Sequence, residues 1–287
     1  MLSEKLLVDE YLKKLGGYSN ISPNLKSLTK ILNYHVEEFC FSTIITFMEN
    51  NVSIEASELH KKLITKKNGG FCIEQNSLLS FVLRNLGYNV KTVLSRAYLG
   101  ELHEGIPPKI HLINIVTIDN KQYLIDPGFG GVTPNIPVCI NDIGVEQKAT
   151  LESFRIVSGE DSNNSTILGG STIMLQVLVK DEWLDMYSFT PEQEAFDTDI
   201  DVAKYHITHS KLPVYLETFL LSRMQDNERF VLYGLDFKHY KQNSVTTIEI
   251  SNYEDFKNIL IKYFNITDID YKKVYEKVYS MWSCKKL

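Results

Sequence analysis

The sequence predicts a multidomain α+β protein in which a helical bundle comes first, an antiparallel β-sheet or barrel follows, and mixed helices and strands end the chain. Through residues 1–90, apolar residues recur at three- and four-residue spacing, the repeat of helices that bury one face. After Gly87 the pattern changes to alternation and β-branched residues become frequent, which is typical of strands. With 287 residues, the chain is long enough for two or three domains.

Four helices are predicted in the first 90 residues, over 3–15, 24–40, 56–67 and 72–86. The third ends at Asn68-Gly69-Gly70, because glycine tolerates positive φ and lets another backbone come close. The fourth begins at Cys72, so this cysteine is expected in the first turn of a helix.

Cys72 is the first candidate for chemistry. A helix N-terminus presents unpaired backbone N–H groups and the positive end of the helix dipole, which favour a thiolate over the free thiol with its pKa of about 8.5. The alternative is a buried cysteine that acts only as a small apolar side chain. The four cysteines are scattered without a C-x-x-C pair, so neither a zinc site nor a disulfide framework is predicted.

The middle of the chain is predicted to form strands over 90–98, 111–118, 122–125, 153–157, 173–179 and 183–189. The second and third of these form a hairpin around a turn at 119–121. From 197 to about 226 helical character returns, and we expect this segment to cross between domains. Strands over 230–233 and 245–250 and helices over 254–263 and 271–287 complete the prediction.

Two hairpin positions are candidates for a base and the group that orients it. His111 begins one strand and Asp126 ends the next, so the two side chains are expected near the same end of a two-stranded ladder. An aspartate there could hold the imidazole while the imidazole activates Cys72. The alternatives stay open at this point, because a histidine at a strand start is often structural and Asp before Pro-Gly is often a turn residue.

Composition and charge narrow the class of partner. The net charge of −6 argues against a nucleic-acid surface or a basic membrane patch, so a small-molecule substrate is expected. The chain shows no apolar run that could cross a bilayer, and its first 17 residues lack the pattern of a secretory signal. We expect a cytoplasmic protein that binds no membrane and no metal.

Three motifs resemble those of the arylamine N-acetyltransferase family. The family's cysteine motif, R-G-G-x-C-x-E-x-N, appears as 68–76; its H-x-L/I-x-x-V strand appears as 111–116; and its V/I-D-x-G-F-G motif appears as 125–130. The three motifs follow in the family's order and at its separations. The resemblance extends over nearly the whole chain, with the last twenty residues the least similar.

The resemblance implies a helical bundle at 1–90 that carries Cys72 and a β-barrel at 91–195 that carries His111 and Asp126. It further implies an interdomain helical segment at 196–225 and an α/β lid at 226–287, around a catalytic core like that of the cysteine proteases.

The implied activity is a two-step acetyl transfer. Acetyl-CoA, as co-substrate, would acetylate Cys72, and an arylamine, hydrazine or arylhydroxylamine would then take the acetyl group, as in xenobiotic metabolism. The resemblance also suggests that Gly128, Gly130 and Gly131 contact the coenzyme phosphates. Alternatives are an amide synthase that acts on a carrier-protein thioester, a papain- or transglutaminase-like hydrolase, and a non-catalytic small-molecule-binding homologue.

Three aromatic residues, Phe71, Tyr98 and Phe129, are candidates for lining the acceptor pocket, although aromatic side chains near a site are as often plain core.

Two positions depart from the family motifs. Asn68 stands where the family has arginine, and Ser42 stands where it has the glutamate of an I-P-F-E-N segment. The loss of a basic and an acidic residue together suggests that a structural ion pair was replaced as a unit. An arginine restored at position 68 alone should therefore destabilise the protein, because an unpaired buried charge is costly.

Overall fold

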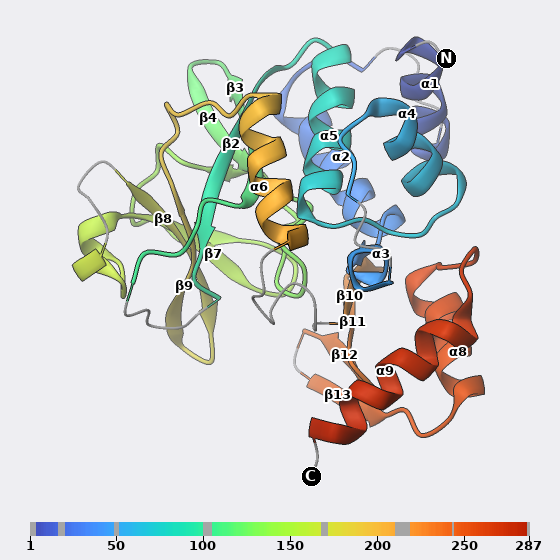
Figure 1. Ribbon diagram of the computed structural model, residues 1–287. Helices are drawn as coiled ribbons and strands as arrows, with labels where there is room; N and C mark the ends of the chain where they lie inside the picture. The colour runs from blue at the N-terminus through green and yellow to red at the C-terminus, as the bar shows by residue number, and fades with distance from the viewer. Residues whose placement is uncertain are drawn as a thin grey trace.

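The fold is described by a computed structural model over residues 4–16, 21–48, 52–99, 105–167, 172–209, 219–242 and 244–285. Its parts are arranged around a common junction (Figure 1): helices from the first 90 residues lie on one side, a barrel of strands lies on the other, and a smaller sheet with the last two helices lies below both. Helix α6 (Asp197–His209) lies over the seam between the helical part and the barrel. This confirms the predicted multidomain α+β fold of helical bundle, antiparallel barrel and α/β lid.

The helical part consists of α1 (Glu4–Lys14), α2 (Leu25–Glu38), α3 (Ile44–Met48), α4 (Ala56–Leu59), the π-helix η1 (His60–Thr65) and α5 (Cys72–Asn85). The predicted helix over 56–67 thus begins as an α-helix and continues as a π-helix. Helix α2 begins at Asn24, whose side chain accepts a hydrogen bond from Ser27 N at 3.0 Å.

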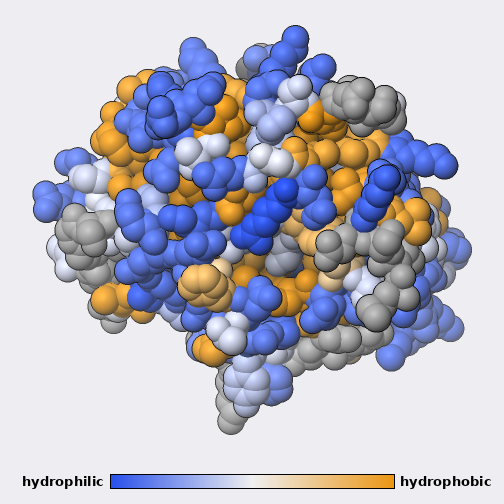
Figure 2. Space-filling model, turned by 90° about the horizontal axis from the view of Figure 1, so that it is seen from above, coloured by the Kyte–Doolittle hydropathy of each residue, from blue (hydrophilic) through white to orange (hydrophobic). Residues whose placement is uncertain are grey.

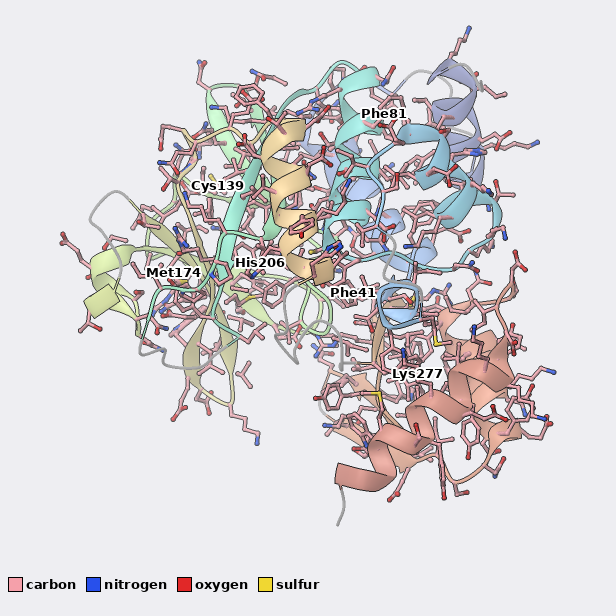
Figure 3. All side chains as sticks on the ribbon, in the orientation of Figure 1. Phe41, Phe81, Cys139, Met174, His206 and Lys277 are labelled. Atoms are coloured by element: carbon pink, nitrogen blue, oxygen red, sulfur yellow. The ribbon has the colours of Figure 1, made fainter. Side chains whose placement is uncertain are left out.

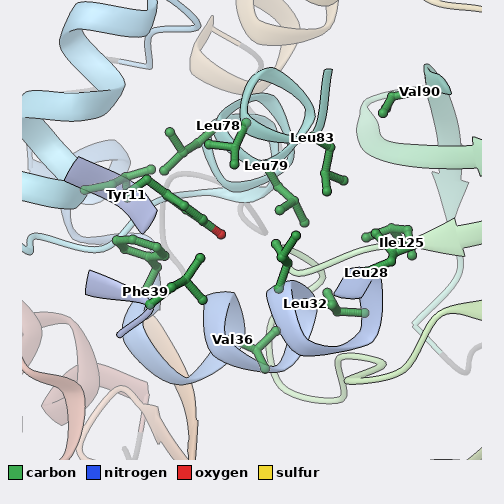
Figure 4. Close-up of a cluster of buried hydrophobic side chains, with 14 of the residues drawn as sticks. Tyr11, Leu28, Leu32, Val36, Phe39, Leu78, Leu79, Leu83, Val90 and Ile125 are labelled. Carbon is green, nitrogen blue, oxygen red and sulfur yellow. The ribbon is translucent and has the colours of Figure 1, made fainter. Parts of the chain in front are cut away.

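A core of apolar side chains joins α2 and α5 to the barrel. Figure 4 shows Leu28 and Leu32 of α2 facing Leu79 and Leu83 of α5, with Ile125 of the barrel beside them. All are buried, so α5 is held on two sides. This packing fixes the helix that begins at Cys72.

The barrel is a nearly closed sheet of eight antiparallel strands in the order β5-β4-β3-β2-β9-β8-β7-β6. The strands are β2 (Asn89–Ala97), β3 (His111–Ile118), β4 (Lys121–Ile125), β5 (Val138–Cys139), β6 (Gln147–Lys148), β7 (Ser153–Ser158), β8 (Ile173–Val179) and β9 (Glu182–Phe189). The predicted hairpin is β3–β4, whose turn residues Asp119 and Asn120 have positive φ, as a tight two-residue turn requires.

One side chain closes the barrel between its two edge strands. The Gln147 side chain accepts a hydrogen bond from Cys139 N at 2.7 Å and donates one to Cys139 O at 2.9 Å. This amide takes the place of a backbone pair between β5 and β6 and satisfies an edge that would otherwise stay unpaired.

The third part is a five-stranded antiparallel sheet in the order β1-β10-β11-β12-β13, covered by α8 (Tyr253–Phe264) and α9 (Tyr271–Lys285). Its strands are β1 (Phe41–Ser42), β10 (Leu220–Gln225), β11 (Glu228–Tyr233), β12 (Asp236–Lys241) and β13 (Ser244–Glu249). The edge strand β1 belongs to the N-terminal part of the sequence and pairs with β10.

The prediction of helix from 197 to about 226 is wrong at its C-terminal end. Helix α6 ends at His209, and residues 220–225 form β10. The reason is that these residues pair with β1 and β11, and the positive φ of Asp226 and Asn227 turns β10 directly into β11. Residues 210–218 lie outside the described part of the chain, and the predicted domain boundaries after 90, 195 and 225 stay predictions.

The surface seen from above is mixed, with hydrophilic residues between smaller hydrophobic areas (Figure 2). Among the described residues, no helix combines the length and the apolar composition that a membrane span requires.

Candidate active site

Cys72 is the first residue of α5 and is 5% exposed. The helix begins here because Glu74, three residues after Phe71, accepts a hydrogen bond from Phe71 N at 3.0 Å. The preceding loop is fixed by Gly70, whose N–H donates to Cys40 O and whose carbonyl accepts from Ser42 N. The sequence prediction of a cysteine in the first turn of a helix is confirmed.

His111 and Asp126 lie together at one end of the β3–β4 ladder. His111 Nε2 and Asp126 Oδ2 are 2.7 Å apart, and the two side chains are 7% and 0% exposed. The Cys72 thiol lies beside the same imidazole, close enough to help raise its pKa. Because Nε2 is taken by the carboxylate, Nδ1 is the ring nitrogen left for the thiol. The three side chains therefore form one row.

Asp126 is held by two further donors. Its Oδ1 accepts from Asn76 Nδ2 and from Gly128 N, both at 2.9 Å. Asn76 is in turn fixed by Asn114, whose Nδ2 donates to the Asn76 side chain and carbonyl at 3.0 Å. These contacts fix the carboxylate plane and leave Oδ2 for the imidazole.

The electrostatics of the row favour a charged histidine. Burial opposes an imidazolium at this position, but the charge and hydrogen bond of Asp126 and the neighbouring Cys72 thiol together outweigh it and raise the pKa of His111 to about 10. Burial likewise opposes the Asp126 carboxylate, yet His111, Asn76 and Gly128 N lower the pKa of Asp126 below its ordinary value.

Aromatic rings surround the imidazole. Phe129 packs edge-on against His111 with ring centroids 5.2 Å apart, and Tyr187 lies at 5.0 Å. Burial and the Asp126 charge raise the pKa of Tyr187 well above its usual range, so Tyr187 stays a neutral phenol. Phe71 lies in the apolar cluster that contains Cys72, and its ring centroid is 5.8 Å from that of Phe41. Two of the three predicted pocket residues, Phe71 and Phe129, thus adjoin the row.

Tyr98 lies elsewhere. It is fully buried with Val157 and Met174, in a cluster separate from the one that contains Cys72. In Figure 3, Met174 lies within the barrel, whereas Phe41 lies at the junction of the three parts. Tyr98 directly follows β2, and its backbone N–H donates to Met186 O of β9, which holds it on the barrel side.

The three predicted glycines have different surroundings. A Cβ at Gly128 would lie 2.9 Å from Cys72 Cα, and one at Gly130 would lie 2.7 Å from the Phe41 ring, so both glycines permit close packing. Their N–H groups are also taken, by Asp126 and by Thr133 Oγ1. Only Gly131, at φ +61°, borders open space.

The two departures from the motifs lie close together in the fold. Asn68 is 7% exposed, and its Oδ1 has no hydrogen-bond partner among the described residues. Ser42 Oγ accepts from Ile44 N at 3.2 Å at the start of α3. The buried ion pair beside this loop is Lys62–Glu74. A cavity of about 520 Å³ adjoins this pair, and neither Cys72 nor His111 lines it.

Asn76, Asn114 and Tyr187 were not among the predicted site residues. Asn114 had a readable signal, because it is the only polar residue in the run 112–116 and β-strands rarely bury an amide without a purpose. The partners of Asn76 and Tyr187 depend on contacts between α5, β3 and β9 that the sequence does not show. Within the described residues, no group of three His, Cys, Asp or Glu side chains could hold a metal ion.

A cysteine, a histidine and an aspartate side by side are the groups that enzymes with a cysteine nucleophile bring together. Comparison with known proteins narrows this class. The family model described as N-acetyltransferase matches residues 24–274. The chain belongs to this N-acetyltransferase family, and the prediction of an arylamine N-acetyltransferase, an acetyl-CoA-dependent acyltransferase, is confirmed at the level of the family.

Two relatives illustrate the similarity. An arylamine N-acetyltransferase of Mycobacterium bovis is 25% identical over 264 residues, which cover 91% of this chain and 89% of the relative. An arylamine N-acetyltransferase of Gallus gallus, a pineal gland isozyme, is 33% identical over 125 residues, which cover 43% of this chain and 43% of the relative.

Solved structures share the fold. The arylamine N-acetyltransferase of Mycobacterium marinum superposes with a TM-score of 0.85 at 23% identity and covers 96% of this chain and 99% of its own. The same enzyme in complex with CoA gives a TM-score of 0.84 at 23% identity, with the same shares of each chain covered.

Proposed function

We propose that this enzyme moves an acetyl group from acetyl-CoA to an aromatic amine, hydrazine or arylhydroxylamine through an acetyl-Cys72 intermediate. The observation that carries the proposal is the 2.7 Å contact between His111 and Asp126, with the Cys72 thiol beside the same imidazole. The names of the relatives support the choice of donor and acceptor, because they are arylamine N-acetyltransferases and one solved relative contains CoA.

In the first step, the Cys72 thiolate attacks the thioester carbonyl of acetyl-CoA. The C–S bond to the coenzyme breaks, CoA leaves as a thiolate that takes the proton from the His111 imidazolium, and the acetyl group stays on Cys72 as a new thioester. A thioester is exchanged for a thioester, so the step needs little net driving force. The unpaired backbone N–H groups of the first turn of α5 can stabilise the oxyanion.

In the second step, the amine nitrogen attacks the acetyl-Cys72 carbonyl. Neutral His111 accepts the proton from the nitrogen, the Cys72 thiolate is expelled, and the product is an amide. The thiolate and the imidazolium are then both restored. Asp126 keeps the imidazole in the tautomer that has Nδ1 free to accept a proton.

The aromatic rings of Phe71 and Phe129 are proposed to line the acceptor site, because both adjoin the row and a flat aromatic amine can stack on them. Of the glycine loop, only Gly131 is proposed to contact the coenzyme, since the N–H groups of Gly128 and Gly130 already bind the protein.

Intact-protein mass spectrometry after mixing with acetyl-CoA tests the proposal. We expect a stable adduct of one acetyl group on Cys72 that is discharged by an aromatic amine and not by buffer alone. Cys40 is a poor competitor, because burial raises the pKa of its thiol to about 12. An adduct lost at the same rate without amine would support hydrolysis, and the absence of an adduct would refute the proposal.

A further inference from the structure

A largely buried ion pair joins Lys62 of η1 to Glu74 in the first turn of α5. Lys62 Nζ contacts both carboxylate oxygens of Glu74, at 2.5 and 2.6 Å. The side chains are 16% and 2% exposed, so solvent reaches the lysine only in part and hardly reaches the glutamate. A buried carboxylate requires such a partner, because removal of one member leaves an uncompensated charge.

Glu74 is two residues from Cys72, and its carboxylate has one favourable and one unfavourable effect on the start of α5. Its Oε2 accepts from Phe71 N at 3.0 Å, which caps the first turn of the helix. The same negative charge opposes a thiolate nearby, because like charges destabilise each other in a buried setting. Glu74 can cap the helix without this penalty only when a cation neutralises it.

Lys62 is fixed from its backbone as well as its side chain. It lies in the π-helix η1, a rare geometry, and its carbonyl accepts a hydrogen bond from Asn68 N at 3.1 Å. Its side chain meanwhile binds Glu74. Lys62 thus contacts Asn68, at the start of the short loop that leads to Cys72, and Glu74, in the helix that follows the loop. Between them, a Cβ at Gly70 would lie only 3.3 Å from Glu74 Cβ.

We propose that Lys62 is a positioning residue for the acetyl-transfer reaction: it holds Glu74 as the cap of α5 and cancels the carboxylate charge that would otherwise disfavour the Cys72 thiolate. The inference rests on the proposed function in that Cys72 is the nucleophile. It deepens that function by linking the reactivity of Cys72 to an ion pair that includes neither His111 nor Asp126.

The test is the pH dependence of Cys72 alkylation by iodoacetamide, followed by mass spectrometry of the peptide that contains Cys72. In Lys62→Met the midpoint of the alkylation profile should rise by about one pH unit, and alkylation below the midpoint should slow roughly tenfold, as expected for an uncovered carboxylate in the same first helical turn at an effective dielectric constant of about 20. Lys62→Arg should keep the wild-type midpoint, because it preserves the cation.

The double variant Lys62→Met/Glu74→Gln separates electrostatic from structural effects. Glutamine keeps the cap but carries no charge, so the midpoint should return to the wild-type value. Glu74→Gln alone should lower the midpoint, because the Lys62 charge is then no longer compensated; this variant carries the test if Lys62→Met fails to fold. The matched control is Lys66→Met, since Lys66 pairs at 3.1 Å with Asp268 and both side chains are exposed. It should behave as the wild type.

Three results overturn the proposal: a folded Lys62→Met protein with an unchanged midpoint, a double variant that is not restored, or a Glu74→Gln midpoint that does not fall. Alkylation needs no acetyl transfer, so the two proposals fail separately. If wild-type enzyme forms no acetyl adduct but its alkylation responds as expected, the proposed function is refuted and the role of Lys62 in setting the reactivity of Cys72 stands.

Discussion

Replacement of Asp126 by asparagine tests the row of three side chains most directly. The change preserves the shape of a fully buried side chain. The asparagine oxygen can still accept from Asn76 Nδ2 and Gly128 N, but its NH₂ group then faces His111 Nε2. Nε2 must become an acceptor, so the proton of a neutral imidazole moves to Nδ1, which faces the thiol. His111 can then no longer take a proton from Cys72.

The size of the effect follows from the electrostatics of His111. Its pKa of about 10 exceeds the ordinary value of 6.5 by an amount equivalent to about 5 kcal/mol in favour of the imidazolium, at about 1.4 kcal/mol per pH unit. Asp126 supplies the largest favourable part and Cys72 the remainder, while burial opposes both. Without the carboxylate the charged imidazole loses most of this stabilisation. Acetylation of Cys72 should fall by about 10³- to 10⁴-fold, as for other triads with this substitution.

Rapid-quench mass spectrometry of acetyl-Cys72 formation measures this rate, and circular dichroism checks that the fold is retained. Alkylation of Cys72 by iodoacetamide near pH 6 should slow in parallel. An Asp126→Asn enzyme that is acetylated and alkylated within about threefold of the wild type would refute the reasoning, because the row could then not be the source of the reactive thiolate.

Three further outcomes are expected. Gly128→Ala should destabilise the fold by about 1–3 kcal/mol in urea unfolding, since its Cβ would lie 2.9 Å from Cys72 Cα, whereas Gly105→Ala, with nothing within 4 Å, should be neutral; equal effects would contradict the packing argument. Asn68→Arg should lower the melting temperature, because it places a charge at a position that is 7% exposed, while the nearby Glu74 carboxylate is already paired with Lys62; an unchanged or higher value would count against the replaced ion pair. The raised pKa of His111 stabilises the folded state fully below about pH 6.5 and progressively less up to about pH 10. The difference in unfolding free energy between the wild type and His111→Asn should therefore shrink from about pH 6.5 to about pH 10. A difference that stays constant over this range would contradict the raised pKa.

Local patterns were enough for most of the fold and for the three members of the row. The periods of 3.6 and 2 separated the helical part from the barrel because each helix and strand buries one face. His111 and Asp126 were predictable as neighbours because a short hairpin fixes its own register: Asn114 pairs with Ile125, which brings the two ends together.

Features that depend on contacts between distant segments were not predictable. The strand β10 was read as helix because its apolar residues suit either structure, and its partners β1 and β11 decide which one forms. Tyr98 was a candidate for the acceptor pocket because it is aromatic, yet it packs with Val157 of β7 and Met174 of β8. Lys62 carried no signal, because a lysine on a helix is ordinarily a solvated surface residue.

The two-residue strand β1 joins parts of the molecule that lie far apart in the chain. Ser42 pairs with Leu221 of the last sheet, while Phe41 forms a bridge with Gly70, two residues before Cys72. A chain still emerging from the ribosome therefore offers this segment its Gly70 bridge but no strand partner until β10 has been synthesised. The surroundings of Cys72 are therefore completed only when the C-terminal third of the chain has been made. If that third were expressed by itself, the β10 edge that β1 covers would be exposed and prone to association with other chains.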